Sequence, residues 1–303
     1  MPSDVAELHK RVVGEIGETR DKEMGDFVSR KSEERKRADK DAAEELKRQK
    51  DAGVDVDKHE ESHRKQAEAR KRELDEIRKR YSARESEPKI IAPEDFVARG
   101  LDAALAPADV KALPPSYAAV FSTKDPDDKL SGGTGTDVFN YNIIDAWDWA
   151  AGDGNGWFGS GAGSYQVWAE WGYWYWVPTT KYYGITTHNT FRGYYIVRSF
   201  DDWWISAYSR AVVSIWVDVW QYNWKGWSNV NALDVGGDNI NVNQRFDTDR
   251  HHYYTALLGG GDWAYIRNVV GLYVYARAGG SYSELNFAAG AANYLSAPHV
   301  HIV

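Results

Sequence analysis

The tryptophans of this chain are confined to one part of the sequence. All fourteen lie between Trp147 and Trp263, whereas residues 1–90 contain only two aromatic side chains, Phe27 and Tyr81. This break divides the chain into a charged front that is poor in aromatic side chains and an aromatic back. The back alone is long enough to bury a sizeable hydrophobic core.

The net charge is also unevenly distributed. Residues 1–90 hold equal numbers of basic and acidic side chains, so the formal charge of −8 belongs to residues 91–303. An acidic surface repels phosphate groups, and we therefore expect neither nucleic acid nor an anionic membrane surface as a partner. The absence of cysteine excludes disulfides and thiolate chemistry.

No apolar stretch reaches the length of a transmembrane helix, and the N-terminus lacks the apolar segment of a secretory signal. We therefore expect a soluble protein without a transmembrane segment. It is predicted to stay in the cytoplasm or to leave the cell by a route that reads no N-terminal signal.

Residues 1–86 are predicted to form a charged helical region. In the first helix, residues 3–50, apolar side chains recur every eleven positions, as at Val5, Ile16 and Phe27. An eleven-residue spacing over three turns keeps such side chains on one face of a nearly straight helix. The stripe is thin, so the helix gains little stability from its own packing.

Gly53 ends this first helix, and a second helix is predicted to run to about Arg84. Its apolar side chains have the spacing of a coiled-coil seam, namely Ala67, Leu74, Ile77 and Tyr81. Three interpretations remain open for this region. It is a helical hairpin packed on the body, a coiled-coil stalk that forms a homo-oligomer, or largely disordered chain.

Residues 87–136 are predicted to be a linker, because they are rich in Pro and Gly. One short helix from Pro93 to Leu105 is expected within it, with the proline in the first turn. Asp125, Asp127 and Asp128 have no downstream glutamate at the spacing of an EF-hand loop, so we interpret them as turn residues.

Residues 137–303 are predicted to form an antiparallel all-β sandwich resembling a jelly roll, because short strands alternate with Gly, Asn and Asp turns. No helical period separates these strands, which argues against a parallel sheet. The fold class is therefore α + β in separate domains: a long helical hairpin or coiled coil, then the sandwich. The predicted strands are 138–149, 164–177, 181–187, 191–198, 203–222, 227–235, 238–246, 251–258, 263–277, 281–287 and 293–302.

Two of these strands, 164–177 and 203–222, carry aromatic side chains on both faces. A sandwich normally exposes its outer faces to water, and each aromatic ring offers about 150–250 Å² of surface. Several such rings together exceed the apolar patch that soluble monomers usually expose. Something must therefore cover this second face: the front helices or connector, another subunit, a carbohydrate, or a hydrophobic membrane or surface.

The second face also supplies the candidate binding residues. Trp and Tyr rings match the C–H faces of sugars, and the interleaved Glu170 and Asp218 can accept hydrogen bonds from hydroxyl groups. We predict a non-enzymatic binding or structural protein, in which a helical stalk presents a head that recognises carbohydrate or another surface. The alternative is an assembly component that uses the aromatic face as a protein–protein interface. The predicted ligand-binding residues are Trp168, Glu170, Trp174, Trp176, Trp216, Asp218, Trp220 and Tyr222.

No motif specifies a reaction, and we predict no catalytic residue and no cofactor. A further alternative is a glycosidase, which needs two carboxylates across a sugar, and Glu170 and Asp218 are the candidates if they lie close together.

A metal-dependent enzyme is the other catalytic alternative. His299 and His301 project from the same face of a terminal strand, which suits two metal ligands if a third exists. The available third ligands are His188, His251 and His252. Ordinary histidines at a strand end are the simpler interpretation.

Overall fold

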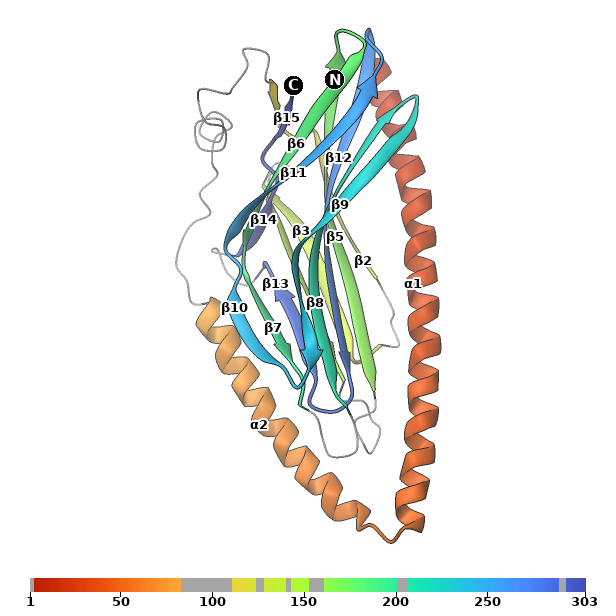
Figure 1. The fold of residues 1–303 in the computed structure, drawn as a ribbon, viewed down its shortest axis with the longest axis vertical. Helices are drawn as coiled ribbons and strands as arrows, with labels where there is room; N and C mark the ends of the chain where they lie inside the picture. Colours follow the sequence, from red (N-terminus) through yellow and green to blue (C-terminus); the bar gives the residue numbers. More distant parts are fainter. Residues whose placement is uncertain are drawn as a thin grey trace.

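The computed structural model contains two long helices and a two-layered β-sandwich (Figure 1). The prediction of an N-terminal helical part followed by an antiparallel sandwich is confirmed. The helix expected from Pro93 to Leu105 lies outside the described residues. Those are 3–82, 111–123, 128–139, 143–152, 161–200, 206–288 and 293–303.

The sandwich consists of two sheets, in which the described strand pairs are antiparallel. Sheet B has the strand order β2-β5-β12-β8-β9: β2 (Tyr117–Ser122), β5 (Ala162–Val177), β12 (Asp262–Arg277), β8 (Tyr208–Gln221) and β9 (Asn223–Asp238). Sheet A contains the remaining strands: β1 (Lys111–Leu113), β3 (Ser131–Phe139), β4 (Ile143–Ala151), β6 (Lys181–Arg192), β7 (Tyr194–Arg198), β10 (Asn241–Arg245), β11 (Thr248–Leu258), β13 (Tyr282–Asn286), β14 (Tyr294–Ser296) and β15 (Val300–Ile302).

Part of the predicted linker belongs to the sandwich. Within residues 87–136, β1, β2 and most of β3 form strands that pair with β15, β5 and β4. The glycines of this segment explain why its sequence predicts a linker rather than strands. A Cβ on Gly135 would lie 2.3 Å from Cγ1 of Val120, so the glycine lets β2 approach β3 closely.

The main core fills the space between the two sheets. The inward faces of β5 and β8 follow the alternation in the sequence: Trp171 and Tyr173 on β5, and Ile215 and Val217 on β8, are completely buried. Both strands belong to sheet B, and their large rings and β-branched side chains bury apolar surface against sheet A.

Helix α1 (Ser3–Asp51) lies along the outer face of sheet B, and α2 (Val56–Ser82) lies on the other side of the sandwich against sheet A (Figure 1). The two helices diverge from the turn at Gly53, whose φ of 78° suits glycine. The predicted break at this glycine is confirmed. Neither helix is apolar enough over a sufficient length to cross a membrane.

The apolar row of α1 packs on the aromatic surface of sheet B. The buried contact joins Val5, Val12 and Ile16 of α1 to Trp174, Trp220 and Tyr265 of the sheet. Further along the helix, the edge of the Phe27 ring meets Tyr273, and the buried Lys31 ammonium pairs with Asp128 and donates to Oγ of Ser131 at 2.8 Å. The eleven-residue row therefore marks the side of α1 that faces the sandwich.

The apolar stripe of α2 is used in the same way. Ile77 is buried against Tyr194 and Ile196 of sheet A, with Leu74 packed beside it, and the Tyr81 ring stacks on Tyr194 at a centroid distance of 4.9 Å. The spacing interpreted as a coiled-coil seam thus serves a contact within one chain. Association between chains through these helices stays a prediction.

Candidate functional site: a tryptophan pocket under helix α1

A cavity of about 430 Å³ lies between α1 and the outer face of sheet B, beyond the end of the apolar contact at Ile16. We call it the tryptophan pocket. It is lined by Ile16, Thr19, Arg20 and Glu23 of α1, Trp168 of β5, Trp216 and Asp218 of β8, Trp224, Gly226 and Trp227 of β9, and Arg267 and Val269 of β12.

Glycines on β12 and on its neighbour β5 give the large rings room to lie flat. A Cβ on Gly271 would come within 2.8 Å of the Trp216 ring, and a Cβ on Gly172 would come within 2.0 Å of the Tyr265 hydroxyl. Each ring therefore lies over a glycine of the neighbouring strand. This arrangement holds the half-buried Trp216 ring in place within the pocket.

A β-bulge brings two tryptophans of the edge strand β9 to the same side. Trp224 pairs with Trp220, and Trp227 pairs with Asp218. A step of three positions on β9 therefore matches a step of only two positions on β8. The extra residue is accommodated near Gly226, whose φ is 122°. Trp224 and Trp227 are 38% and 65% exposed, so they offer ring surface at the mouth of the pocket.

The floor of the pocket contains one guanidinium shared by two carboxylates. Arg267 donates from Nε to Oε2 of Glu170 at 2.9 Å and from Nη1 to Oδ2 of Asp218 at 3.0 Å. The strand order explains the arrangement, because β12 lies between β5 and β8. Glu170 and Asp218 therefore share a sheet and a common partner, which the sequence alone could not establish.

Burial raises the pKa of both carboxyl groups, and Arg267 opposes that effect. The Glu170 side chain is 1% exposed and the Asp218 side chain 17% exposed, so only Asp218 is open to a molecule in the pocket. Both carboxylates are ion-paired with Arg267.

The predicted binding residues separate into three groups. Trp168, Trp216 and Asp218 line the pocket, and Glu170 lies below it against Arg267. Trp174 and Trp220 are covered by α1, and Nε1 of Trp174 donates to Nδ1 of His9 at 3.1 Å. Both rings are therefore buried by the apolar row of α1, and their role in ligand binding stays a prediction. Trp176 and Tyr222 are 47% and 62% exposed and do not line the pocket.

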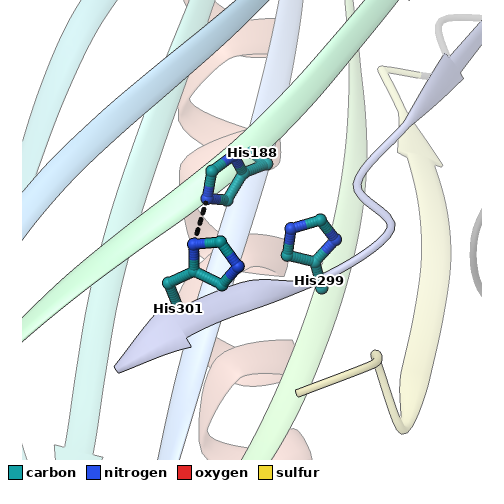
Figure 2. A group of neighbouring side chains, drawn as sticks. All are labelled: His188, His299 and His301. Atoms are coloured by element: carbon teal, nitrogen blue, oxygen red, sulfur yellow. Dashed lines mark hydrogen bonds between the residues drawn. The ribbon is translucent and has the colours of Figure 1, made fainter. Parts of the chain in front are cut away.

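The predicted histidine pair lies on the other sheet. His299 and His301 gather with His188, and Nε2 of His188 lies 3.0 Å from Nδ1 of His301 (Figure 2). His251 lies beside them on β11, opposite His188. His252 is the next residue of the strand, so its side chain faces the other side of the sheet.

Comparisons with known proteins identify no family for this chain. No family model matches it, and no curated protein is similar to it.

Several solved structures show weak likeness. The carbohydrate-binding module TmCBM61, in complex with β-1,4-galactotriose, is 11% identical over 61% of this chain and 90% of its own, with a TM-score of 0.20. A module from the lichenase of Cellvibrio mixtus, in complex with cellotriose, is 14% identical over 63% and 95%, with a TM-score of 0.17. The isomalto-dextranase of Arthrobacter globiformis T6, complexed with panose, is 12% identical over 64% of this chain but only 23% of its own, with a TM-score of 0.21. Scores this low support no conclusion about fold or function.

Proposed function

We propose that this chain is a non-enzymatic carbohydrate-binding protein, and that the tryptophan pocket is its binding site. The observation that carries the proposal is the lining of the pocket, where tryptophan rings surround a small set of charged groups. Its volume of about 430 Å³ is typical of small-molecule sites, which span roughly 300–1,000 Å³.

The rings match the apolar part of a sugar. The C–H faces of a pyranose lie well against flat aromatic surfaces, and Trp offers the largest such surface of any side chain. Trp168 and Trp216 supply half-buried rings inside the pocket, and Trp224 and Trp227 supply exposed rings at its mouth. An extended chain of sugar units has room to continue past the open side.

The charged side chains of the pocket can form hydrogen bonds with the hydroxyl groups of a sugar. Asp218 and Glu23 accept hydrogen bonds, and Arg20 and Arg267 donate them, so both directions are available around one cavity. Hydrogen bonds to charged groups contribute about 1.5–3 kcal/mol each, more than bonds between neutral groups. The acidic charge of residues 91–303 favours neutral sugars over phosphorylated or sulfated ones.

The experiment compares two exposed tryptophans, only one of which lines the pocket. A glycan array identifies bound neutral oligosaccharides, and calorimetry then measures their affinity for Trp227→Ala and the matched control Trp176→Ala. We expect Trp227→Ala to weaken binding about tenfold, a loss of about 1.4 kcal/mol of ring contact. Trp176→Ala should bind like the parent chain. An array without any bound glycan, or equal losses in the two variants, would contradict the proposal.

A second candidate function is an assembly component with an aromatic protein interface. It is favoured by exposed rings outside the pocket, notably Trp176, Tyr222 and Tyr253. Light scattering of the full chain distinguishes the two functions, because the interface requires a concentration-dependent oligomer that Trp176→Ala weakens. A monomer at all concentrations excludes self-association through this surface.

A further inference from the structure

The buried histidines on sheet A form a compact group of nitrogen ligands. One ligand atom each from His188, His299 and His301 lies within 4.8 Å of the others, and the three side chains are 4%, 0% and 4% exposed. Figure 2 shows the three rings turned toward a common space between β6 and the C-terminal strand. No carboxylate belongs to this group in the described part of the chain.

Strand pairing places these side chains on one face of the sheet. Val300 and Ile302 of β15 point into the core, so His299 and His301, which alternate with them, lie on the outer face. β15 pairs with β6, where Thr187 stands opposite Val300, and this register brings His188 beside both rings. The ring centroids of His188 lie 4.6 Å from His299 and 4.4 Å from His301.

We propose that His188, His299 and His301 bind one divalent transition-metal ion and that His251 completes its coordination. His251 stands opposite His188 on β11, and the two ring centroids are 4.5 Å apart. Because His251 is exposed, it lies at the solvent side of the group, where an ion can enter.

The geometry fits the bond lengths of such an ion. With metal–nitrogen bonds of about 2.0–2.1 Å, a tetrahedral site separates its nitrogens by roughly 3.4 Å. Nε2 of His188 lies 3.0 Å from Nδ1 of His301, which is close to this value. Small ring rotations bring a nitrogen of His299 within reach of the same ion. Nε2 of His301 is buried without a hydrogen-bond partner among the described residues.

The chemistry selects the class of metal. Imidazole nitrogens favour Zn²⁺, Cu²⁺, Ni²⁺ and Co²⁺, whereas Ca²⁺ and Mg²⁺ need oxygen ligands. The ion would hold the three-residue strand β15 against β6 and β11 and so stabilise the C-terminal edge of the fold.

The test is Zn²⁺ titration of the full chain by calorimetry, with His252→Gln as the matched control. His252 neighbours His251 in sequence but faces the other side of the sheet. We expect one Zn²⁺ per chain with a dissociation constant below about 1 µM, typical of a site with several imidazole ligands. His301→Ala should weaken binding about 100-fold or more, because even the loss of a residue that only hydrogen-bonds to a metal ligand costs about 10–100-fold. His252→Gln should leave the affinity unchanged.

A spectroscopic measurement keeps the proposal testable if His301→Ala fails to fold. Co²⁺ added to the unmodified chain should give the intense visible absorption of a four-coordinate nitrogen site, and excess Zn²⁺ should remove it. Saturation with Zn²⁺ should raise the thermal midpoint by about 5 °C. The proposal is overturned if the unmodified chain binds neither ion, or if a folded His301→Ala variant binds Zn²⁺ as tightly as the parent.

Discussion

Arg267 on β12 donates from Nε to Oε2 of Glu170 on β5 at 2.9 Å, and that glutamate side chain is only 1% exposed. A carboxylate buried this deeply costs several kcal/mol of solvation, which its partner must offset. The same guanidinium also binds Asp218, so it joins β5 and β8 across the central strand. The ion pair is therefore a structural support for the pocket above it.

Arg267→Met should lower the free energy of unfolding by about 3–5 kcal/mol, because it leaves Glu170 buried without a partner. Combining it with Glu170→Gln should recover part of this loss, since the buried charge is then removed. Urea denaturation of these two variants and the parent at pH 7 measures both effects. The control is Arg210→Met, which breaks the half-exposed pair with Asp234 and should cost less than about 1 kcal/mol. Similar losses for the two arginines would contradict this role.

Ile16→Asp should release the first part of α1 from sheet B, at a cost of at least about 3 kcal/mol, because it places a charge in a buried apolar contact. Trp174 and Trp220 then meet water, so tryptophan emission should shift to longer wavelength and proteases should cut α1. Sugar binding should also be lost, since α1 forms one wall of the pocket. Glu18→Asp puts the same side chain on the exposed side of the helix and should change none of these signals. A protease-resistant α1 in the Ile16→Asp variant would show that the contact is dispensable.

The sequence predicts the surplus aromatic face because side-chain alternation is a local property. Alternation on β5 and β8 correctly separates the core residues Trp171 and Ile215 from the outward Trp168 and Trp216. Alternation does not reveal which outward rings a helix covers. That depends on where α1 docks, which is a long-range contact, and α1 covers two of the predicted binding residues, Trp174 and Trp220.

The residues that the sequence missed depend on register or on strand order. Trp224 and Trp227 share a face only because of the bulge near Gly226, which shifts the alternation of β9 by one residue. Arg267 bridges Glu170 and Asp218 because β12 is the central strand, and single-sequence patterns do not specify strand order. Strand pairing also brings the predicted candidate ligand His188 next to His301, although 113 positions separate the two in sequence. The glycine at position 226 was the only local signal in the sequence that a bulge was possible.

Glu284→Ala should loosen α2 while leaving α1 in place. Its carboxylate accepts hydrogen bonds from Nε of Arg78 at 2.9 Å, from the hydroxyls of Tyr194 and Tyr282 at 3.0 and 2.6 Å, and from Nδ2 of Asn286 at 3.1 Å. Removing it takes the acceptor from four buried or half-buried donors, a loss of about 3 kcal/mol or more. Hydrogen exchange should accelerate in residues 71–82 and stay unchanged in residues 5–20. Asp75→Ala breaks only the exposed i,i+3 pair with Arg78 and should leave both helices protected. Slow exchange of α2 in Glu284→Ala would assign its docking to the apolar stripe alone.

Asp148→Asn should make the chain more stable at pH 7 than the parent, with a smaller gain at pH 4. Burial and the nearby Glu284 hold the pKa of Asp148 well above its ordinary range, which the backbone amide of Leu285 opposes only in part. The unfolded chain releases this proton above about pH 3.9 while the folded chain retains it, so this group lowers stability as pH rises.

Asp234→Asn should show the opposite trend, because Arg210 lowers the pKa of that carboxyl and the stabilisation is lost as pH falls. Urea denaturation measures the free energy of unfolding of each variant and of the parent at both pH values. The histidines contribute equally to the variant and the parent at a given pH, so their contribution cancels in the difference. A gain for Asp148→Asn that is equal at pH 4 and pH 7 would show that Asp148 is ionised in the folded chain.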